Sequence, residues 1–512
     1  MGFLHTYLDD CVRRHPDKEA IVTREGRCSY ARLSRSANQL GAALQQRGVR
    51  RGERVAILLE NSIEAAAALY GVLRIGGVFI VINPQTKADK LAYLLQDSGA
   101  TALITARGFE DVYNSAVKAA PACRTLIVAG LAAASDPGPC QQLVMEEIFS
   151  SGSDSVAPSG LIDYDLASLV YTSGSTGKPK GVMLSHVNMC TAAEAIATYL
   201  ELRNDDRILC ALPMAFDYGL YQLLLSVHVG ATLILEKSFV FPAKVLELMV
   251  QERVTVLPGI PTIYSMLLGF SALAKYDLSA LRTLTNTAAA LPLRQISDLR
   301  AAFPQARIFS MYGLTECKRV TYLPPDQLDI RPDSVGRGMP NEELWLVDEN
   351  GQRLPNGSTG ELVIRGSHVM RGYWRDPAAT ALRLRPGPLQ GETVLYSGDI
   401  FRTDAEGYLY FVGRRDDIIK SRGQKVSPRE IEDVLYRLDG VQEAAAIGID
   451  DAAWGQAIKV FVVARPGVAL GDKQVLLHCR QYLEDYMMPK EVAIVPELPK
   501  TDTGKIRKTG LK

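Results

Sequence analysis

The sequence predicts an α/β protein with three parts: a large N-terminal domain of parallel α/β lobes, a small β-barrel subdomain on those lobes, and a small α+β C-terminal domain. Two observations predict this order. Short apolar runs alternate with helical patterns from residue 54 onward, which is typical of parallel sheets covered by helices. From about Ser334 the runs become shorter and turn residues become frequent, which predicts antiparallel strands.

The α/β rhythm is clearest near the N-terminal end of the chain. Residues 54–59 form an apolar run, the alanine-rich stretch 62–75 has the length of a helix, and 78–82 is a second apolar run. Apolar runs of about four to eight residues are typical of buried strands. The same pattern predicts further strands at 101–105, 125–128, 231–235 and 255–257.

The later parts of the chain have different patterns. Segments 343–351 and 360–366 contain short strand-like runs, and the first ends in the turn pair Asn350-Gly351, which favours a hairpin. The last unit has the order helix, strand, strand, helix, at 427–438, 444–449, 457–464 and 474–486. We therefore expect a large domain at 1–415, divided into lobes at 1–333 and the β subdomain at 334–415, and a mobile C-terminal domain at 416–512.

Composition excludes several classes of function. A chain of 512 residues is too long to form a single hydrophobic core. Its 57 Lys and Arg residues balance its 57 Asp and Glu residues. A net charge near zero gives no long-range attraction to nucleic acid or to an anionic membrane, so a small-molecule enzyme is favoured. Eight cysteines form no C-x-x-C pair and six histidines show no metal-ligand spacing, which indicates reduced thiols without a structural metal. With no targeting peptide or membrane segment in the pattern, we expect a cytoplasmic protein; its oligomeric state stays open.

The most informative segment is a loop that follows an apolar run. It reads Leu169-Val-Tyr-Thr-Ser-Gly-Ser-Thr-Gly-Lys-Pro-Lys180. Glycines let backbone N–H groups turn toward an anion, hydroxyls donate to phosphate oxygens, and Lys178 and Lys180 supply charge. The spacing is not that of a Walker A loop, because Gly174 and Gly177 are too close together and Pro179 follows Lys178. The loop predicts binding of a nucleotide.

Four further segments follow this loop in order: Met311-Tyr-Gly-Leu-Thr-Glu316, Leu395-Tyr-Ser-Gly-Asp399, Gly413-Arg-Arg-Asp-Asp-Ile-Ile-Lys420 and Pro499-Lys-Thr-Asp-Thr-Gly-Lys505. Together with the loop they resemble the motifs of the adenylate-forming superfamily, which includes acyl- and aryl-CoA synthetases, luciferases and the adenylation domains of peptide synthetases. The resemblance covers essentially the whole chain. In the second segment, leucine replaces an aromatic residue, and serine replaces threonine while keeping the hydroxyl.

The resemblance implies ATP and Mg²⁺ as cofactors, with a role for each motif. Glu316 would face Mg²⁺ as the metal-binding residue, Asp399 would accept both ribose hydroxyls, and Arg414 would contact the nucleotide. Lys505 would stabilise charge at the α-phosphate. The implied catalytic residues are Lys505, Thr172 and Glu316. The implied nucleotide-binding residues are Thr172, Ser173, Gly174, Ser175, Thr176, Gly177, Lys178, Lys180, Ala288, Ala289, Ala290, Tyr312, Gly313, Thr315, Asp399 and Arg414.

The implied reaction has two steps. A carboxylate attacks ATP to give an acyl-adenylate and pyrophosphate, and a thiol then displaces AMP. Asp416 would be the hinge about which the C-terminal domain rotates between the steps. That rotation would remove Lys505 and bring the segment 420–423 toward the thiol.

The segment around Asp217 is expected to line the site of the small-molecule carboxylic acid. Amino-acid-activating relatives have an aspartate in this context that pairs with the substrate ammonium, and a buried aspartate without a cationic partner is costly. Asp217 therefore implies a cationic substrate, unless it caps a helix that begins at Tyr218. Tyr218 and Tyr221 would shorten the site, and Arg319 would bind a second carboxylate or polar group, or pair with an internal acid. The other implied lining residues are Gly259, Thr287, Met311 and Val320.

Two functions stay open, and a third is disfavoured. The leading interpretation is a freestanding enzyme that activates a small α- or β-amino acid and transfers it to the phosphopantetheine thiol of a separate carrier protein in natural-product assembly. The alternative is an acyl-CoA synthetase for a small or medium-chain acid, with coenzyme A as the thiol. A non-catalytic binding module is disfavoured because Lys178, Glu316, Asp399, Arg414 and Lys505 are all present.

Overall fold

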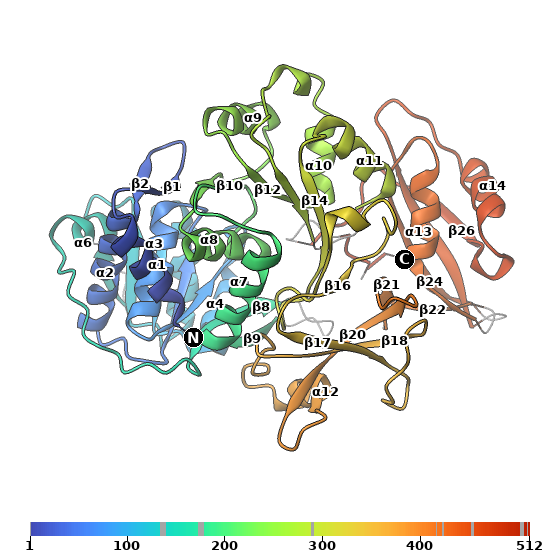
Figure 1. The fold of residues 1–512 in the computed structure, drawn as a ribbon. Coiled ribbons are helices and arrows are strands. Elements are labelled where there is room, and N and C mark those ends of the chain that lie inside the picture. Colours follow the sequence, from blue (N-terminus) through green and yellow to red (C-terminus); the bar gives the residue numbers. More distant parts are fainter. Residues whose placement is uncertain are drawn as a thin grey trace.

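The computed structural model describes residues 2–133, 140–172, 179–287, 291–415, 417–421, 424–451, 455–501, 506–508 and 510–511. These residues form two large sheets in the N-terminal part, a smaller antiparallel sheet below them, and a C-terminal unit at the right of the view (Figure 1). This arrangement confirms the predicted fold class. None of the helices in the described part of the chain is long and apolar enough to cross a membrane.

The first large sheet has seven strands in the order β7-β6-β5-β3-β4-β8-β9, and only the pair β8 and β9 is antiparallel. Alternate residues of β3 belong to different hydrophobic clusters, with Val55 in one and Ala56 in the other. Both faces of the strand are therefore buried, as its continuous apolar run predicts. The strands are β3 (Arg54–Leu58), β4 (Val78–Val81), β5 (Ala102–Ala106), β6 (Thr125–Ala129), β7 (Gln141–Val144), β8 (Leu166–Thr172) and β9 (Lys180–Ser185).

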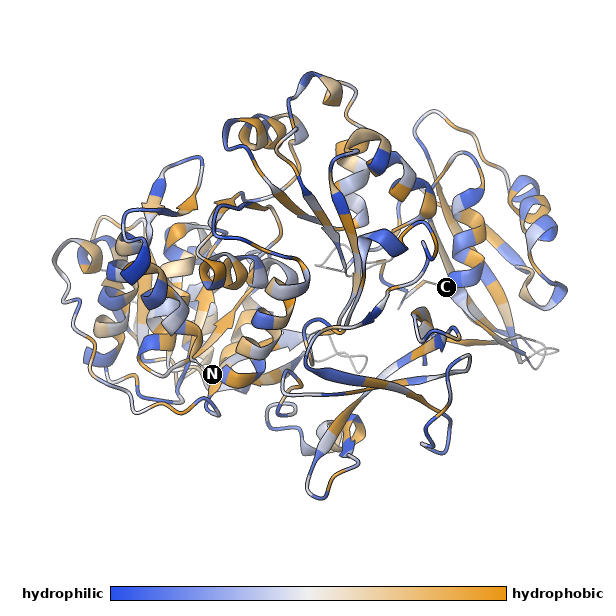
Figure 2. Cartoon of the chain, in the orientation of Figure 1, coloured by the Kyte–Doolittle hydropathy of each residue, from blue (hydrophilic) through white to orange (hydrophobic). Residues whose placement is uncertain are grey.

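Helices cover this sheet, and apolar residues follow the strands and the helix faces turned toward them (Figure 2). Helix α2 packs on α3, and α4 packs on α5. Ser62 and Ser185 cap α3 and α7 with their side chains. The helices of this part are α1 (Leu4–Arg14), α2 (Tyr30–Gln46), α3 (Ile63–Arg74), α4 (Ala88–Ser98), α5 (Glu110–Ala119), α6 (Met145–Ser151) and α7 (His186–Tyr199).

The second large sheet has nine strands in the order β16-β15-β14-β13-β12-β10-β11-β1-β2. Its inner six strands are parallel, and β2, β15 and β16 pair antiparallel. The strands are β1 (Glu19–Val22), β2 (Arg27–Ser29), β10 (Arg207–Cys210), β11 (Thr232–Leu235), β12 (Val256–Gly259), β13 (Thr283–Asn286), β14 (Arg307–Tyr312), β15 (Thr321–Leu323) and β16 (Arg337–Gly338). The helices between them are α8 (Asp217–Val229), α9 (Pro242–Gln251), α10 (Pro261–Leu268) and α11 (Leu293–Ala302).

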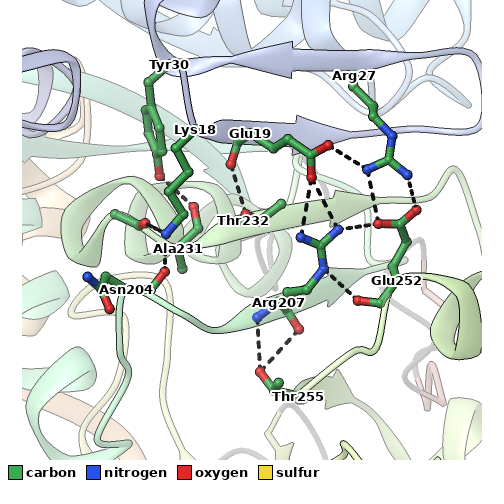
Figure 3. A network of polar contacts seen from close by, with 11 residues as sticks. Lys18, Glu19, Arg27, Tyr30, Asn204, Arg207, Ala231, Thr232, Glu252 and Thr255 are labelled. Carbon is green, nitrogen blue, oxygen red and sulfur yellow. Dashed lines mark hydrogen bonds and ion pairs between the residues drawn. The ribbon is translucent and has the colours of Figure 1, made fainter. Parts of the chain in front are cut away.

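Within this sheet, a network of charged side chains joins the N-terminal hairpin β1–β2 to β10 and to Glu252, which follows α9 (Figure 3). Glu252 is 3% exposed and lies between two arginines, accepting from Arg27 Nη2 at 2.5 Å and from Arg207. Glu19 completes the network, with Oε1 2.7 Å from Arg27 and Oε2 3.4 Å from Arg207. A buried carboxylate such as Glu252 stabilises the contact between the hairpin and β10 only while both arginines are present.

Removal of the Glu252 carboxylate is expected to weaken the contact between hairpin β1–β2 and β10. In the Glu252→Ala variant, Arg27 and Arg207 lose their common partner, and we expect the free energy of unfolding to fall by about 2 kcal/mol. Urea unfolding checks this value. The control is Glu25→Ala, because Glu25 is exposed and lies 3.9 Å from Lys237; it is expected to change stability by less than about 0.5 kcal/mol. Equal losses in both variants would contradict the role of Glu252.

The third sheet is antiparallel and curled. It has the order β17-β18-β20-β19, with β21 also paired to β20. The first strand within this sheet is β17, and the residues just before β16 already contact the sheet, since the Val335 N–H donates to the Leu409 carbonyl of β21 at 2.9 Å. The predicted domain limits stay a proposal. The elements are β17 (Glu342–Val347), β18 (Thr359–Gly366), α12 (Pro377–Arg383), β19 (Leu384–Pro386), β20 (Thr393–Thr403) and β21 (Leu409–Arg414).

The C-terminal unit has its own hydrophobic core, formed by strands and two helices. Its sheet contains the predicted pair of long strands, and also a short hairpin and a last strand that the sequence pattern did not predict. Arg429 donates to the Phe411 carbonyl at 3.3 Å and thereby joins this unit to β21. The elements are β22 (Ile419–Ser421), β23 (Gln424–Val426), α13 (Pro428–Arg437), β24 (Val441–Asp451), β25 (Gly455–Ala464), α14 (Asp472–Tyr482) and β26 (Glu491–Ile494).

His186, the first residue of α7, is fully buried. Its Nδ1 accepts the backbone N–H of Leu4 at 3.3 Å. Burial lowers the pKa of His186 to about 4, because the charged ring would lose its hydration. The histidine is therefore neutral in the fold, and its role is structural.

Because His186 is buried in its neutral form, we expect the protein to lose stability in acid. Between pH 6.5 and about 4 the unfolded state binds a proton at His186 that the folded state does not, so stability falls as pH falls. For His186→Gln, we expect the loss of stability between pH 7 and pH 5 to be smaller than in the wild type by about 2 kcal/mol. Urea unfolding at both pH values measures this difference, and the exposed His15→Gln is the control. An unchanged difference in His186→Gln would contradict the prediction.

Candidate active site

The loop that follows β14 carries residues of two predicted sites. Lys318 has a φ of 70°, which is unusual for a residue with a side chain, and its N–H donates to the Leu314 carbonyl at 2.7 Å. The chain then turns back, so that the Val320 N–H donates to the Tyr312 carbonyl at 3.0 Å. A Cβ on Gly313 would lie 2.0 Å from the Lys318 carbonyl oxygen, so only glycine fits there. This tight turn holds Glu316 and Arg319 three residues apart in one loop.

Several predicted phosphate and Mg²⁺ residues lie around Tyr373. The Tyr373 hydroxyl donates to Glu316 Oε1 at 2.6 Å, and Lys180 Nζ lies 5.6 Å from the centre of its ring. Thr172 is opposite Lys180 in the β8–β9 hairpin. Burial and the negative charge of Glu316 raise the pKa of Tyr373, so its hydroxyl stays a proton donor. The structure therefore brings Thr172, Lys180 and Glu316 together.

The predicted nucleoside residues meet where β14 and β21 end, beside the middle of β20. The Tyr312 hydroxyl donates to Asp399 Oδ2 at 2.5 Å, and Arg414 lies opposite Asp399 in the strand register. The Tyr312 ring contacts Phe401, edge to face, with ring centres 4.9 Å apart. Burial raises the pKa of Tyr312 well above its ordinary value, so this residue also orients a carboxylate as a neutral donor.

The acid site is organised differently from the expectation for Asp217. The structure pairs Asp217 Oδ1 with the ammonium of Lys318, whose side chain is 1% exposed. The premise that this carboxylate lacks a cation in the chain is therefore wrong. The alternative role, a helix cap, is also wrong, because α8 begins at Asp217 itself and its cap residue Phe216 has no side-chain hydrogen bond.

Other predicted acid-site residues meet around Tyr218. Its hydroxyl lies 2.6 Å from the Thr285 carbonyl oxygen at the end of β13. The guanidinium carbon of Arg319 lies 4.7 Å from the centre of its ring, a distance typical of cation–π contacts. Met311 joins the same region, since its sulfur accepts from the Tyr199 hydroxyl at 2.9 Å.

Four predicted lining residues lie in the protein core near this region. The Tyr221 hydroxyl donates to the Met189 carbonyl of α7 at 3.3 Å, so it points between two helices. A Cβ on Gly259 would lie 2.5 Å from the ring of Tyr264, which covers this glycine. Val320 is fully buried and Thr287 is 3% exposed. Their predicted contact with the acid stays a prediction.

Some predicted residues lie outside the described part of the chain. These are Ser173, Gly174, Ser175, Thr176, Gly177, Lys178, Ala288, Ala289, Ala290, Asp416 and Lys505. Next to residue 416, the Arg415 N–H donates to the Gly398 carbonyl at 2.9 Å and its side chain pairs with Glu361 at 3.1 Å.

Three site residues were missed by the sequence analysis: Tyr373, Lys318 and Tyr199. Each acts on a predicted residue through a contact between distant parts of the chain. The only signal for Lys318 was its place beside Glu316 in a loop, and a lysine beside such a motif is usually solvated. No local pattern marks a tyrosine as a hydrogen-bond donor to a carboxylate 57 positions away.

The donor set fits Mg²⁺ bound together with a nucleotide. Among the described residues, no three His, Cys, Asp or Glu side chains form a metal-binding group. Mg²⁺ does not need such a group, because it is often held by one or two carboxylates plus substrate phosphates. Glu316 would be that carboxylate, and Lys180, whose ammonium lies 3.5 Å from Asp376, would be the cation that meets phosphate charge.

Comparison with known proteins agrees with this geometry. Residues 8–374 match the AMP-binding enzyme family, and residues 430–505 match the AMP-binding enzyme C-terminal domain. A feruloyl-CoA synthase from Amycolatopsis is 34% identical over 97% of this chain and 96% of its own length. A long-chain-fatty-acid–CoA ligase from Bacillus subtilis is 30% identical over 98% of this chain and 93% of its own.

A solved structure shows the same fold. The anthranilate CoA ligase AuaEII, determined with anthranoyl-AMP, matches with a TM-score of 0.90 and 29% identity, over 99% of this chain and 95% of that one. The cofactors of such enzymes are ATP and Mg²⁺. The chain therefore belongs to the AMP-binding enzymes of the adenylate-forming superfamily, and it is an ATP-dependent, AMP-forming acid–thiol ligase.

Proposed function

We propose that this enzyme joins a carboxylic acid to coenzyme A through an acyl-adenylate. The observation that carries the proposal is the Asp217–Lys318 ion pair. Because Lys318 already neutralises Asp217, the site does not need a substrate ammonium, which was the reason to expect an amino acid. The similarity to CoA ligases over nearly the whole chain supports coenzyme A as the thiol.

The chain's own residues supply orientation and charge for both steps. Asp399, held by Tyr312, would bind the ribose hydroxyls, and Glu316, held by Tyr373, would bind Mg²⁺. Lys180 would meet phosphate charge, and Lys505 would act at the α-phosphate. Mg²⁺, when bound, neutralises phosphate charge. Positioning and charge neutralisation can account for such a reaction without a protein nucleophile.

The competing interpretation is activation of an amino acid for a separate carrier protein. The two proposed functions differ in the acid and in the thiol, so one experiment that varies both substrates separates them. The purified protein is given ATP, Mg²⁺ and a panel of aliphatic, aryl, α-amino and β-amino acids, with either coenzyme A or a phosphopantetheine-loaded carrier protein. We expect thioesters of acids without an ammonium group, formed on coenzyme A. Thioesters of amino acids formed only on the carrier would overturn the proposal.

A further inference from the structure

Arg319 is a buried cation without a carboxylate partner among the described residues. Its residue is 4% exposed, and no described Asp or Glu forms an ion pair with it. Its Nε atom is buried and finds no hydrogen-bond acceptor in the described part of the chain. Burial of an unpaired charge is costly, and proteins tolerate it mainly where a ligand completes the site.

The aromatic groups around Arg319 do not neutralise it. Its guanidinium lies over the Tyr218 ring at 4.7 Å, and its charge also acts on Tyr199 and Tyr221. Burial is the larger effect on these tyrosines, raising the pKa of Tyr218 to about 12 and that of Tyr199 and Tyr221 above the ordinary value. All three hydroxyls are therefore neutral at physiological pH.

Asp217 and Glu342, whose charges act on the same tyrosines as Arg319, are already accounted for. Asp217 is paired with Lys318. Glu342 is buried, its Oε1 accepts the Met339 N–H at 2.8 Å, and burial raises its pKa well above the ordinary value. Its Oε2 lies 3.0 Å from His368 Nε2, and burial lowers the pKa of that histidine to about 4, so burial favours the uncharged form of both groups. Arg319 is therefore the cation of this cluster for which the described residues supply no ion-pair partner.

We infer that Arg319 binds a second carboxylate of the acid substrate, so that the enzyme activates dicarboxylic acids at one end. This inference rests on the proposed function and names its substrate class. A guanidinium presents paired N–H donors that match a carboxylate, and stacking on Tyr218 keeps its plane fixed. Because Glu316 and Arg319 belong to one tight loop, one end of the acid would lie toward the phosphates and the other against Arg319.

The test uses the first half-reaction, so it does not depend on the thiol. Pyrophosphate exchange is measured for succinate, glutarate, adipate and phthalate, and for butyrate, pentanoate, hexanoate and benzoate as matched acids without the second carboxylate. The wild type is expected to prefer one diacid over its matched monoacid by about 100-fold or more in kcat/KM. Arg319→Met is expected to abolish that preference, and Arg319→Lys to keep part of it, since lysine keeps the charge without the planar donor pair.

A matched control removes an arginine of β14, the strand that precedes the Arg319 loop. Arg307 of β14 stacks on Phe309 at 5.6 Å and pairs with Glu201 at 3.0 Å; Arg307→Met should leave the preference unchanged. Wild-type activation of monoacids as efficiently as diacids, activation of no diacid, or a diacid preference that survives in folded Arg319→Met would each overturn the inference. Diacid adenylation followed by transfer only to a carrier protein would refute coenzyme A as acceptor and leave the Arg319 inference standing.

Discussion

Replacement of Glu316 by glutamine is expected to lower kcat for adenylate formation by about 1000-fold, which corresponds to roughly 4 kcal/mol of lost charge stabilisation. The amide keeps the shape of the side chain and can still meet the Tyr373 hydroxyl at 2.6 Å. It cannot supply the anionic oxygen that Mg²⁺ prefers. Pyrophosphate release over a range of Mg²⁺ concentrations measures the loss, and circular dichroism checks that the variant folds.

Tyr373→Phe is the companion variant for Glu316. It leaves the carboxylate in place and removes only the donor that orients it, so we expect a decrease of about tenfold, near the value of one hydrogen bond to a charged group. If Glu316→Gln kept more than a tenth of wild-type activity, Glu316 would not be a metal-binding residue. If both variants lost activity equally, orientation would matter more than charge.

Replacement of Asp399 by alanine is the second large effect that we expect. Two hydrogen bonds to an ionised carboxylate are lost, so kcat/KM for ATP should fall by at least about 100-fold. The Tyr312 hydroxyl, now without its acceptor at 2.5 Å, adds to the penalty. Titration of the rate with ATP at saturating acid gives the value, and KM for the acid should change little.

The control for Asp399 separates ribose binding from local structure. Tyr312→Phe keeps the ring against Phe401 and removes only the hydroxyl, so its effect should stay within about tenfold. A further comparison uses 2′-deoxy-ATP, which should lose its disadvantage in Asp399→Ala, because the group that reads the hydroxyl is absent. Equal discrimination by the wild type and Asp399→Ala would contradict the ribose role.

Local patterns predicted most of the fold, because the strands of the lobes are continuous apolar runs separated by helices. The predicted strand at 125–128, for example, is β6 (Thr125–Ala129). Local patterns failed where pairing is non-local. Ile21 pairs with Leu233, more than two hundred positions away, so nothing near residues 19–29 indicates that this hairpin completes the second sheet. The short strands β22, β23 and β26 carry too few residues to give a pattern of their own.

The candidate site shows the same limit at the level of single residues. The motifs implied nucleotide-binding roles for Tyr312 and Asp399, and these roles stay predictions; the structure adds that the Tyr312 hydroxyl donates to Asp399. The motifs could not show that Lys318 neutralises Asp217, because these residues are 101 positions apart and meet only through the left-handed turn at Lys318. The sequence therefore predicted acid activation with ATP correctly, and it gave the wrong premise about the partner of Asp217.

The central claim is that the acid is activated as an acyl-adenylate, and the fate of its carboxylate oxygen tests this most directly. An acid labelled with ¹⁸O in both carboxylate oxygens is converted with ATP, Mg²⁺ and coenzyme A, and the products are analysed by mass spectrometry. Attack on the α-phosphate forms a bond from one labelled oxygen to phosphorus, and the thiol then breaks the bond between carbon and that oxygen. The account predicts one ¹⁸O in AMP and none in pyrophosphate, whereas ¹⁸O in inorganic phosphate together with ADP would contradict it.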